Sequence, residues 1–257
     1  MFTDMQAFRR KLAQSSPCFG VGITFTDPAV SEAIGPSVDF LWIDLEHNPI
    51  SLESMQAHLM AARAARVPAL VRVPSSDVPM IKRVLDSGAV GLIVPQVRSA
   101  AEVRQVVDAC RYKPLGDRGY APRRPSNYGR SGGAGFMQTS NQEVFVAVQI
   151  ENGAALDDLE AIAAVPHLDA LVIGPADLSI SIGIAWASPE LHAAMQRIVA
   201  TAKRHGLSVG IGMGPDERFA QTAVELGVNW IQVGSDFSYM VSFADQLFAR
   251  IRRGPAK

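Results

Sequence analysis

Several residues that could do chemistry follow directly after apolar stretches of the sequence, and the first example is "DFLWIDLEHNPI" (residues 39–50). Four apolar residues lead to Asp44, Glu46 and His47, which are two carboxylates and an imidazole. A histidine beside a carboxylate can act as a general base, because the carboxylate orients the ring and stabilises its protonated form. We therefore expect Asp44 and His47 to belong to a proton-transferring site.

Arg72 lies inside a second apolar stretch, "PALVRVP". Burial of an unpaired guanidinium group costs a large free energy, so this arginine needs a partner. Asp44 or Glu46 could pair with it in a structural role, or it could bind the carbonyl or carboxylate of a substrate. The sequence alone leaves both roles open.

A third group of polar residues occurs in "VQIEN" and "IGPADLS". Gln149 and Glu151 are two residues apart on a predicted strand, so their side chains point to the same side. The strand before Asp177 should lie roughly 4.8 Å away, so Glu151 and Asp177 could converge. Two carboxylates without clustered Cys or His suit a hard cation such as Mg²⁺ or Mn²⁺. The alternative is a pair of rim carboxylates that bind backbone amides or arginine.

The elements that must position these residues alternate regularly along the chain. Nearly continuous apolar stretches alternate with helical patterns eight times, which is typical of a parallel sheet covered by helices. The length of 257 residues suits one (β/α)8 TIM barrel, an α/β fold that typically has roughly 250 residues and carries its catalytic groups at the C-terminal strand ends. The predicted strands cover residues 18–25, 38–45, 67–73, 89–95, 144–150, 169–175, 207–213 and 230–236.

The composition excludes several classes of function. A net charge of −1 and the lack of a basic stripe argue against nucleic acid as a partner. No stretch reaches the roughly 18 apolar residues of a membrane span. Residues 1–14 mix acidic and basic groups and predict a short N-terminal helix rather than a signal peptide. The two cysteines are far apart in the sequence and are expected to be reduced, which favours a cytoplasmic protein. We expect residues 1–257 to form a single domain.

One segment departs from the alternation. Residues 111–143, after the fourth barrel helix, are rich in Gly, Pro and Arg and predict a long loop. A connection of this length is uncommon unless it is functional or disordered. It is either a solvated insertion or a loop that faces the substrate or another subunit.

The motifs together resemble the HpcH/HpaI family of class II pyruvate aldolases. The resemblance runs from about residue 18 to 236 and includes "IKRVLDSGAVGLIVPQV" and "YKPLGDRGY" in the family's order. It implies a (β/α)8 barrel that cleaves or forms carbon–carbon bonds through a metal-bound enolate of pyruvate or hydroxypyruvate. The implied metal is Mg²⁺ or Mn²⁺, with Co²⁺ as a further option, and no organic cofactor is needed. The partners are a keto acid, an aldehyde and further copies of the chain, as a hexamer in which the last helix is swapped between subunits.

The resemblance also implies roles for the residues that match the family's motifs. Glu151 and Asp177 match the metal ligands, and Arg72 matches the arginine that steadies the enolate. His47 matches the base. The further matches are Asp44 in the same network, Asp86 as the acid that orients the histidine, and the substrate-contacting residues Gln149, Gly174, Ala176 and Asp177.

The loop "GYAPRRPSNYGRSGG" differs from that of better-known relatives. We expect it to help shape the pocket of the acceptor aldehyde, from its own or a neighbouring subunit, with Arg123, Arg124 and Tyr128 as candidates. Met213, after the seventh strand, could line the same pocket or belong to the core.

Three other functions remain open at this point. Two are enzymatic: a CoA-thioester lyase of the citrate lyase or malyl-CoA lyase type, and a siderophore-type citrate synthase that condenses oxaloacetate. The third is a barrel that binds keto acids without catalysis. The presence of a base, an arginine and two metal ligands argues against the third.

Overall fold

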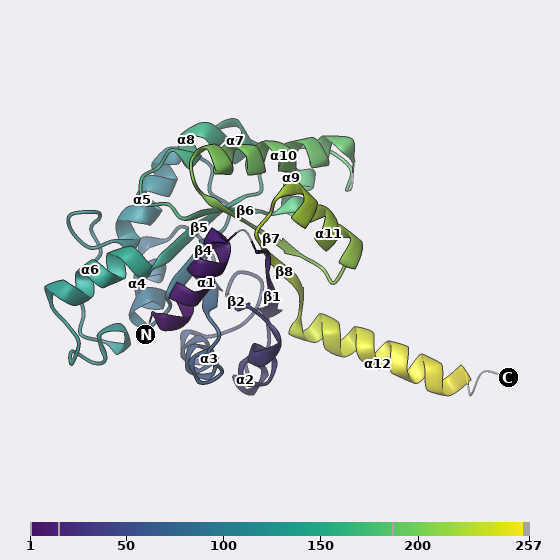
Figure 1. Cartoon of the computed structure of the whole chain (residues 1–257), viewed down its shortest axis with the longest axis horizontal. Coiled ribbons are helices and arrows are strands. Elements are labelled where there is room, and N and C mark those ends of the chain that lie inside the picture. Colours follow the sequence, from purple (N-terminus) through teal and green to yellow (C-terminus); the bar gives the residue numbers. More distant parts are fainter. Residues whose placement is uncertain (1, 15, 187, 254–257) are drawn as a thin grey trace.

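A closed barrel of parallel strands forms the centre of the molecule (Figure 1). The computed structural model describes residues 2–14, 16–186 and 188–253. Within these residues each strand pairs with the next along the chain, and the eighth pairs with the first, which confirms the predicted (β/α)8 fold. The strands are β1 (Cys18–Ile23), β2 (Phe40–Asp44), β3 (Ala69–Arg72), β4 (Gly91–Val94), β5 (Phe145–Ile150), β6 (Ala170–Ile173), β7 (Ser208–Met213) and β8 (Trp230–Ser235).

Helices surround this barrel and cover the outward side chains of the strands. Many begin at a residue whose side chain accepts the hydrogen bond of a backbone N–H three positions on, as at Ser51, Asp77, Ser99 and Asp216. The helices between the first and last strands are α2 (Ala29–Ile34), η1 (Gly35–Ser37), α3 (Leu52–Ala64), α4 (Val78–Asp86), α5 (Ala100–Cys110), η2 (Arg124–Ser126), α6 (Ala134–Glu143), α7 (Gly153–Asp157), α8 (Leu159–Ala163), α9 (Pro175–Ser181), α10 (Pro189–Arg204) and α11 (Glu217–Leu226).

The N-terminal end of the barrel is closed by the short helix that the sequence predicts, α1 (Thr3–Ala13). Phe8 is buried there, with its ring centroid 5.5 Å from that of Phe40, 5.8 Å from Phe145 and 6.4 Å from Trp230. These aromatic rings fill the end of the barrel at which the strands begin. The opposite end, where the strands finish, is therefore the one that remains for a site, and we call it the mouth.

The segment 111–143 is more ordered than the predicted long loop, because it contains η2 and the ten-residue helix α6. Arg111 is buried within it and donates hydrogen bonds to the carbonyls of Asn141, Val144 and His167. Phe136 packs on Tyr112. The Gly and Pro residues that predict a loop are concentrated before Ala134, so they concealed the helix that follows them.

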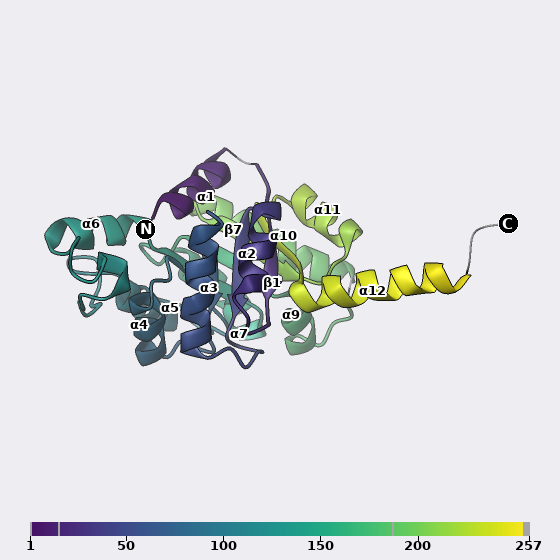
Figure 2. The ribbon, with the colours of Figure 1, turned by 90° about the horizontal axis from the view of Figure 1, so that it is seen from below.

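The last helix, α12 (Asp236–Arg253), leaves the barrel and extends away from it (Figures 1 and 2). Its first residue is held to the segment that follows β1, because the carboxylate of Asp236 accepts hydrogen bonds from the N–H groups of Thr24 and Phe25. Large apolar side chains along the helix are exposed, namely Phe237, Met240, Val241, Phe243, Phe248 and Ile251. Over the ranges described, no helix combines the length and apolarity that a membrane crossing needs.

Candidate active site

Arg72 is fixed at the mouth by carboxylates that follow β2. Asp44 and Arg72 are partners in the register of β2 and β3, and Arg72 Nε donates to Asp44 Oδ1 at 2.8 Å. Arg72 Nη1 lies 2.9 Å from Glu46 Oε2. Burial by itself disfavours the charged guanidinium, but the hydrogen bond and charge of Asp44 outweigh it and raise the pKa of Arg72. The contacts with Asp44 and Glu46 therefore stabilise the charged form of the arginine.

Asp44 fixes the position of the Arg72 side chain. Its two oxygens accept hydrogen bonds from Arg72, from the N–H of Glu46 at 3.0 Å and from Asn48 Nδ2 at 2.6 Å. The Arg72 guanidinium also lies over the ring of Trp42, 5.5 Å from its centroid. The hydrogen bond to Asp44, the ion pair with Glu46 and the ring of Trp42 together fix the orientation of the Arg72 guanidinium.

Glu151 lies almost fully buried beside this arginine, with 1% of its surface exposed. Gln149 Nε2 donates to its Oε2 at 2.5 Å, which confirms that Gln149 and Glu151 point to the same side. The backbone N–H of Gln96, after β4, donates to its Oε1 at 2.7 Å. Gln96 has a φ of 56°, a left-handed conformation that is uncommon for residues with a side chain. Both carboxylate oxygens are thus held in place.

Gly174 has no side chain, and this makes room for Glu151. A Cβ atom on Gly174 would lie 2.5 Å from Glu151 Oε2 and 2.7 Å from Glu151 Cβ. Gly174 directly precedes α9, whose first turn carries Ala176 and Asp177, both exposed. The N–H groups of a first turn have no acceptor within their own helix. These donors and Glu151 therefore border the same part of the mouth.

The electrostatics of the carboxylates fit a divalent cation. Burial, the largest cause, and the negative charges of Glu46 and Asp177 raise the pKa of Glu151 to about 7, against the lowering by the Gln96 hydrogen bond. A cation between such groups would stabilise their charged forms. Among the described residues, no three His, Cys, Asp or Glu side chains form a ready-made metal site. Two carboxylates with open positions suit Mg²⁺ or Mn²⁺, which keep water or substrate oxygens as further ligands.

His47 is at the mouth but bonds to neither of its expected acids. Its side chain is 62% exposed, and its Nε2 lies 3.6 Å from Glu46 Oε2. Asp86 is the last residue of α4, a helix that runs from the mouth to the other end of the barrel. There Asp86 Oδ1 lies 3.4 Å from Arg118 Nη2. Within one chain, Asp86 therefore does not orient His47, and Glu46 is the carboxylate beside it.

The remaining candidates lie away from the centre of the mouth. Met213 is buried in the hydrophobic core, which favours the second of its two expected roles. Arg123, Arg124 and Tyr128 lie around η2, beside the end of α4, so they are near the end of the barrel where β4 begins. They cannot shape the mouth of their own chain.

Sequence reasoning did not identify the role of Gln96, and it left the role of Glu46 open. Gln96 acts through its backbone N–H, and no side-chain type identifies that role. Glu46 stands in the same motif as Asp44 and His47, but its contact with both Arg72 and His47 depends on how the chain turns after β2. Burial, the largest cause, raises the pKa of Glu46, with Arg72 and His47 acting against it.

Comparisons with known proteins agree with this fold. The family described as "HpcH/HpaI aldolase/citrate lyase" matches residues 25–242. The chain is 34% identical to a hydroxypyruvate/pyruvate aldolase of Paraburkholderia phytofirmans, over 98% of this chain and 100% of the relative. It is 36% identical to a 4-hydroxy-2-oxovalerate aldolase of Novosphingobium aromaticivorans, over 96% of this chain and 95% of the relative. A crystal structure of an HpcH/HpaI aldolase/citrate lyase family protein from Burkholderia cenocepacia superposes with a TM-score of 0.87 at 32% identity, covering 93% of this chain and 95% of that chain.

Proposed function

The chain belongs to the HpcH/HpaI aldolase/citrate lyase family, and on this premise we propose that it cleaves and forms 4-hydroxy-2-oxo acids. The products of cleavage are pyruvate, or hydroxypyruvate, and an aldehyde. The observation that carries this proposal is Arg72, a permanently charged guanidinium that is held rigidly beside the buried Glu151. A fixed positive charge is what the enolate of a keto acid needs where its negative charge develops.

Glu151 and Asp177 are the residues that would hold a divalent cation, Mg²⁺, Mn²⁺ or Co²⁺, and we propose that the enzyme depends on one. When bound there, the cation polarises the keto group and offsets negative charge. The described lysines lie in α1, α4, α10 and the loop after α5, not at the mouth, so a Schiff-base mechanism has no candidate nucleophile among them.

The other residues of the mouth bind substrate and move the proton. The N–H groups of Ala176 and Asp177 point from the first turn of α9 and would hold the carboxylate of the keto acid. Arg72 would contact the keto oxygen, and Gln149, which accepts a hydrogen bond from Arg72 Nη1 at 3.4 Å, would lie near the bound keto acid. In cleavage, His47 accepts the proton of the 4-hydroxyl group as the carbon–carbon bond breaks, and it returns the proton in synthesis. Its exposure allows it to face an aldehyde that enters from solvent.

Exchange of the methyl protons of pyruvate in D₂O tests this function without a choice of aldehyde. Proton NMR should show loss of the methyl signal with Mg²⁺ or Mn²⁺ present and none with EDTA. Glu151→Gln should abolish the exchange, whereas Glu190→Gln, an exposed carboxylate on α10, should leave it unchanged. Absence of exchange in folded protein with metal would contradict the proposal and favour a CoA thioester or oxaloacetate as substrate.

We further propose that the enzyme works as a homo-oligomer in the cytoplasm, with the hexamer as the expected form. The exposed apolar side chains of α12 support assembly, because they lower the free energy only when another surface removes them from water. The buried free thiols of Cys18 and Cys110 suit a reducing compartment. Light scattering should show a lower mass for Phe243→Ser and an unchanged mass for Ser242→Ala on the same helix.

A further inference from the structure

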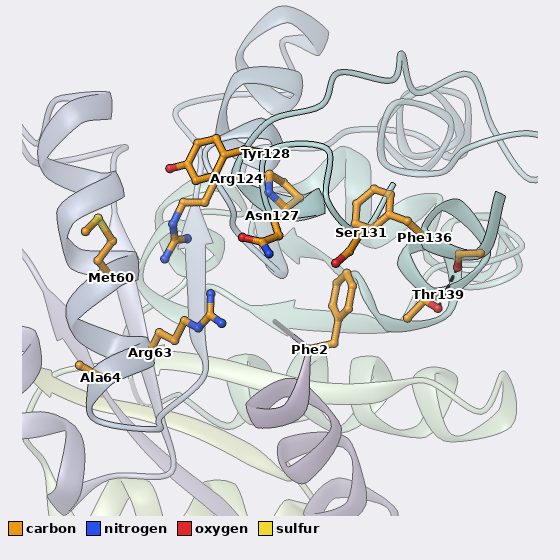
Figure 3. A pocket seen from close by; sticks show the side chains of 12 residues that line it. Phe2, Met60, Arg63, Ala64, Arg124, Asn127, Tyr128, Ser131, Phe136 and Thr139 are labelled. Carbon is orange, nitrogen blue, oxygen red and sulfur yellow. Dashed lines mark hydrogen bonds between the residues drawn. The ribbon is translucent and has the colours of Figure 1, made fainter. Parts of the chain in front are cut away.

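A large pocket lies away from the mouth, at the end of the barrel that α1 closes (Figure 3). Its volume is about 910 Å³. The last turns of α3, the residues around η2, the start of α6 and Phe2 form its walls. Because α3 runs from the mouth to the opposite end, none of these walls belongs to the candidate active site.

Two arginines enter this pocket without a partner. Figure 3 shows Arg63 and Arg124 pointing into the pocket from α3 and from η2. Neither forms an ion pair with any carboxylate in the described part of the chain, and Arg124 donates only long hydrogen bonds, of 3.4 Å, to backbone carbonyls. Asp4 lines a smaller adjoining hollow with both arginines but is not paired with either.

The two guanidinium groups act against each other electrostatically. Burial, and after it the positive charge of Arg63, lower the pKa of Arg124. Arg63 is exposed and Arg124 is half-buried, so an anion that bound between them would offset the repulsion between the two positive charges. The protein as a whole has a net charge of −1, so this positive site is not part of a generally basic surface.

The wall opposite the arginines is apolar. Phe2 and Phe136 lie on that side, Asn127 lies between them and the arginines, and Ser131 lies beside Phe136 (Figure 3). Pockets for small molecules combine an apolar lining with a few placed polar groups, typically in roughly 300–1,000 Å³. This pocket has that size and that division.

We propose that this pocket is a second binding site, for a small organic anion whose carboxylate or phosphate group lies between Arg63 and Arg124 and whose apolar part lies against Phe2 and Phe136. Guanidinium groups bind both kinds of anion through charge-assisted hydrogen bonds. The pocket lies away from the mouth of its own chain, and its test measures binding of an anion and not turnover.

Calorimetric titration of the full protein with benzoate and with inorganic phosphate tests the proposal. Saturating pyruvate and Mg²⁺ keep the mouth occupied during the titration. We expect saturable binding that weakens about tenfold or more in Arg63→Gln and in Arg124→Gln, since each loses a charge-assisted contact. Arg197→Gln on α10 is the matched control and should bind as the wild type does.

Two further variants separate the charge from the apolar wall. Asp4→Asn removes the nearby negative charge and should tighten the binding of both anions. Phe2→Ala should weaken benzoate and leave phosphate unchanged. If phosphate alone binds, the apolar part of the proposal is wrong.

Three results would overturn the site as a whole. They are no saturable binding of either anion, equal binding by the arginine variants and the wild type, and a changed molecular mass or aldehyde preference in the double variant R63Q/R124Q. The last result would mean that a second copy of the chain covers the pocket.

Discussion

Gly174→Ala adds one methyl group where the structure has no room for it. The new Cβ would lie 2.5 Å from Glu151 Oε2, whereas ordinary contact begins at 3.4 Å, so the carboxylate must move by about 0.9 Å (3.4 − 2.5). The φ of Gly174 is −102°, which alanine adopts without strain, so the effect is one of packing and not of backbone conformation. A displacement of ~1 Å at a reacting centre can cost about 10²-fold in rate. We therefore expect kcat/KM to fall about a hundredfold, or about 2.7 kcal/mol in activation free energy.

The assay combines pyruvate exchange with the affinity for Mn²⁺ in the absence of substrate. The overpacked variant should also lose about 1–3 kcal/mol in the free energy of unfolding, which thermal melting measures. Gly214→Ala is the control, because a Cβ on Gly214, after β7 at the same mouth, meets nothing within 4 Å. If Gly174→Ala bound Mn²⁺ and exchanged pyruvate as Gly214→Ala does, the position assigned to Glu151 would be refuted.

Three other predictions concern the groups around this site and one buried histidine. Arg72→Lys keeps the charge but lacks the planar fork whose Nε and Nη1 contact Asp44 and Glu46 separately, so pyruvate exchange should fall about 10²–10³-fold. A loss below tenfold would contradict the rigid placement. Gln96→Gly should keep the left-handed backbone and the Mn²⁺ affinity, whereas Gln96→Val should weaken both the affinity and the fold by about 1–3 kcal/mol of strain. Burial lowers the pKa of His58 from its ordinary 6.5, so the unfolded chain takes up a proton that the folded one resists, and stability should fall as the pH drops below 6.5. Urea unfolding at pH 7.5 and 5.5 should show a smaller difference for His58→Gln than for the wild type.

The barrel and the strand ends could be predicted because they depend on local patterns. Each strand is a short apolar stretch, and Asp44, Arg72 and Glu151 follow such stretches directly, so their common position at the mouth follows from the fold. The pairing of Arg72 with Asp44, one of the two structural partners that the sequence leaves open, requires only that β2 and β3 be neighbours.

The other parts of the site depend on details that no pattern carries. The left-handed backbone of Gln96, after β4, and the room left by Gly174, after β6, depend on how these strands flank β5 in three dimensions. Asp86 matches a motif, but its place on α4 puts it at the far end of the barrel in its own chain. The segment after α5 mixes loop-forming residues with a helix, so composition alone could not place Arg124 and Tyr128.

Because α12 extends away from the barrel, the stability and assembly of this enzyme should depend on protein concentration. If its exposed apolar side chains are covered only when another chain binds, the free energy of the assembled state follows mass action. Each tenfold dilution then removes about 1.4 kcal/mol from every association step between two chains. The melting temperature would rise with protein concentration, and assays at nanomolar and micromolar enzyme would sample different populations. A C-terminal tag, placed at the far end of α12, would act on that equilibrium before it acted on the site.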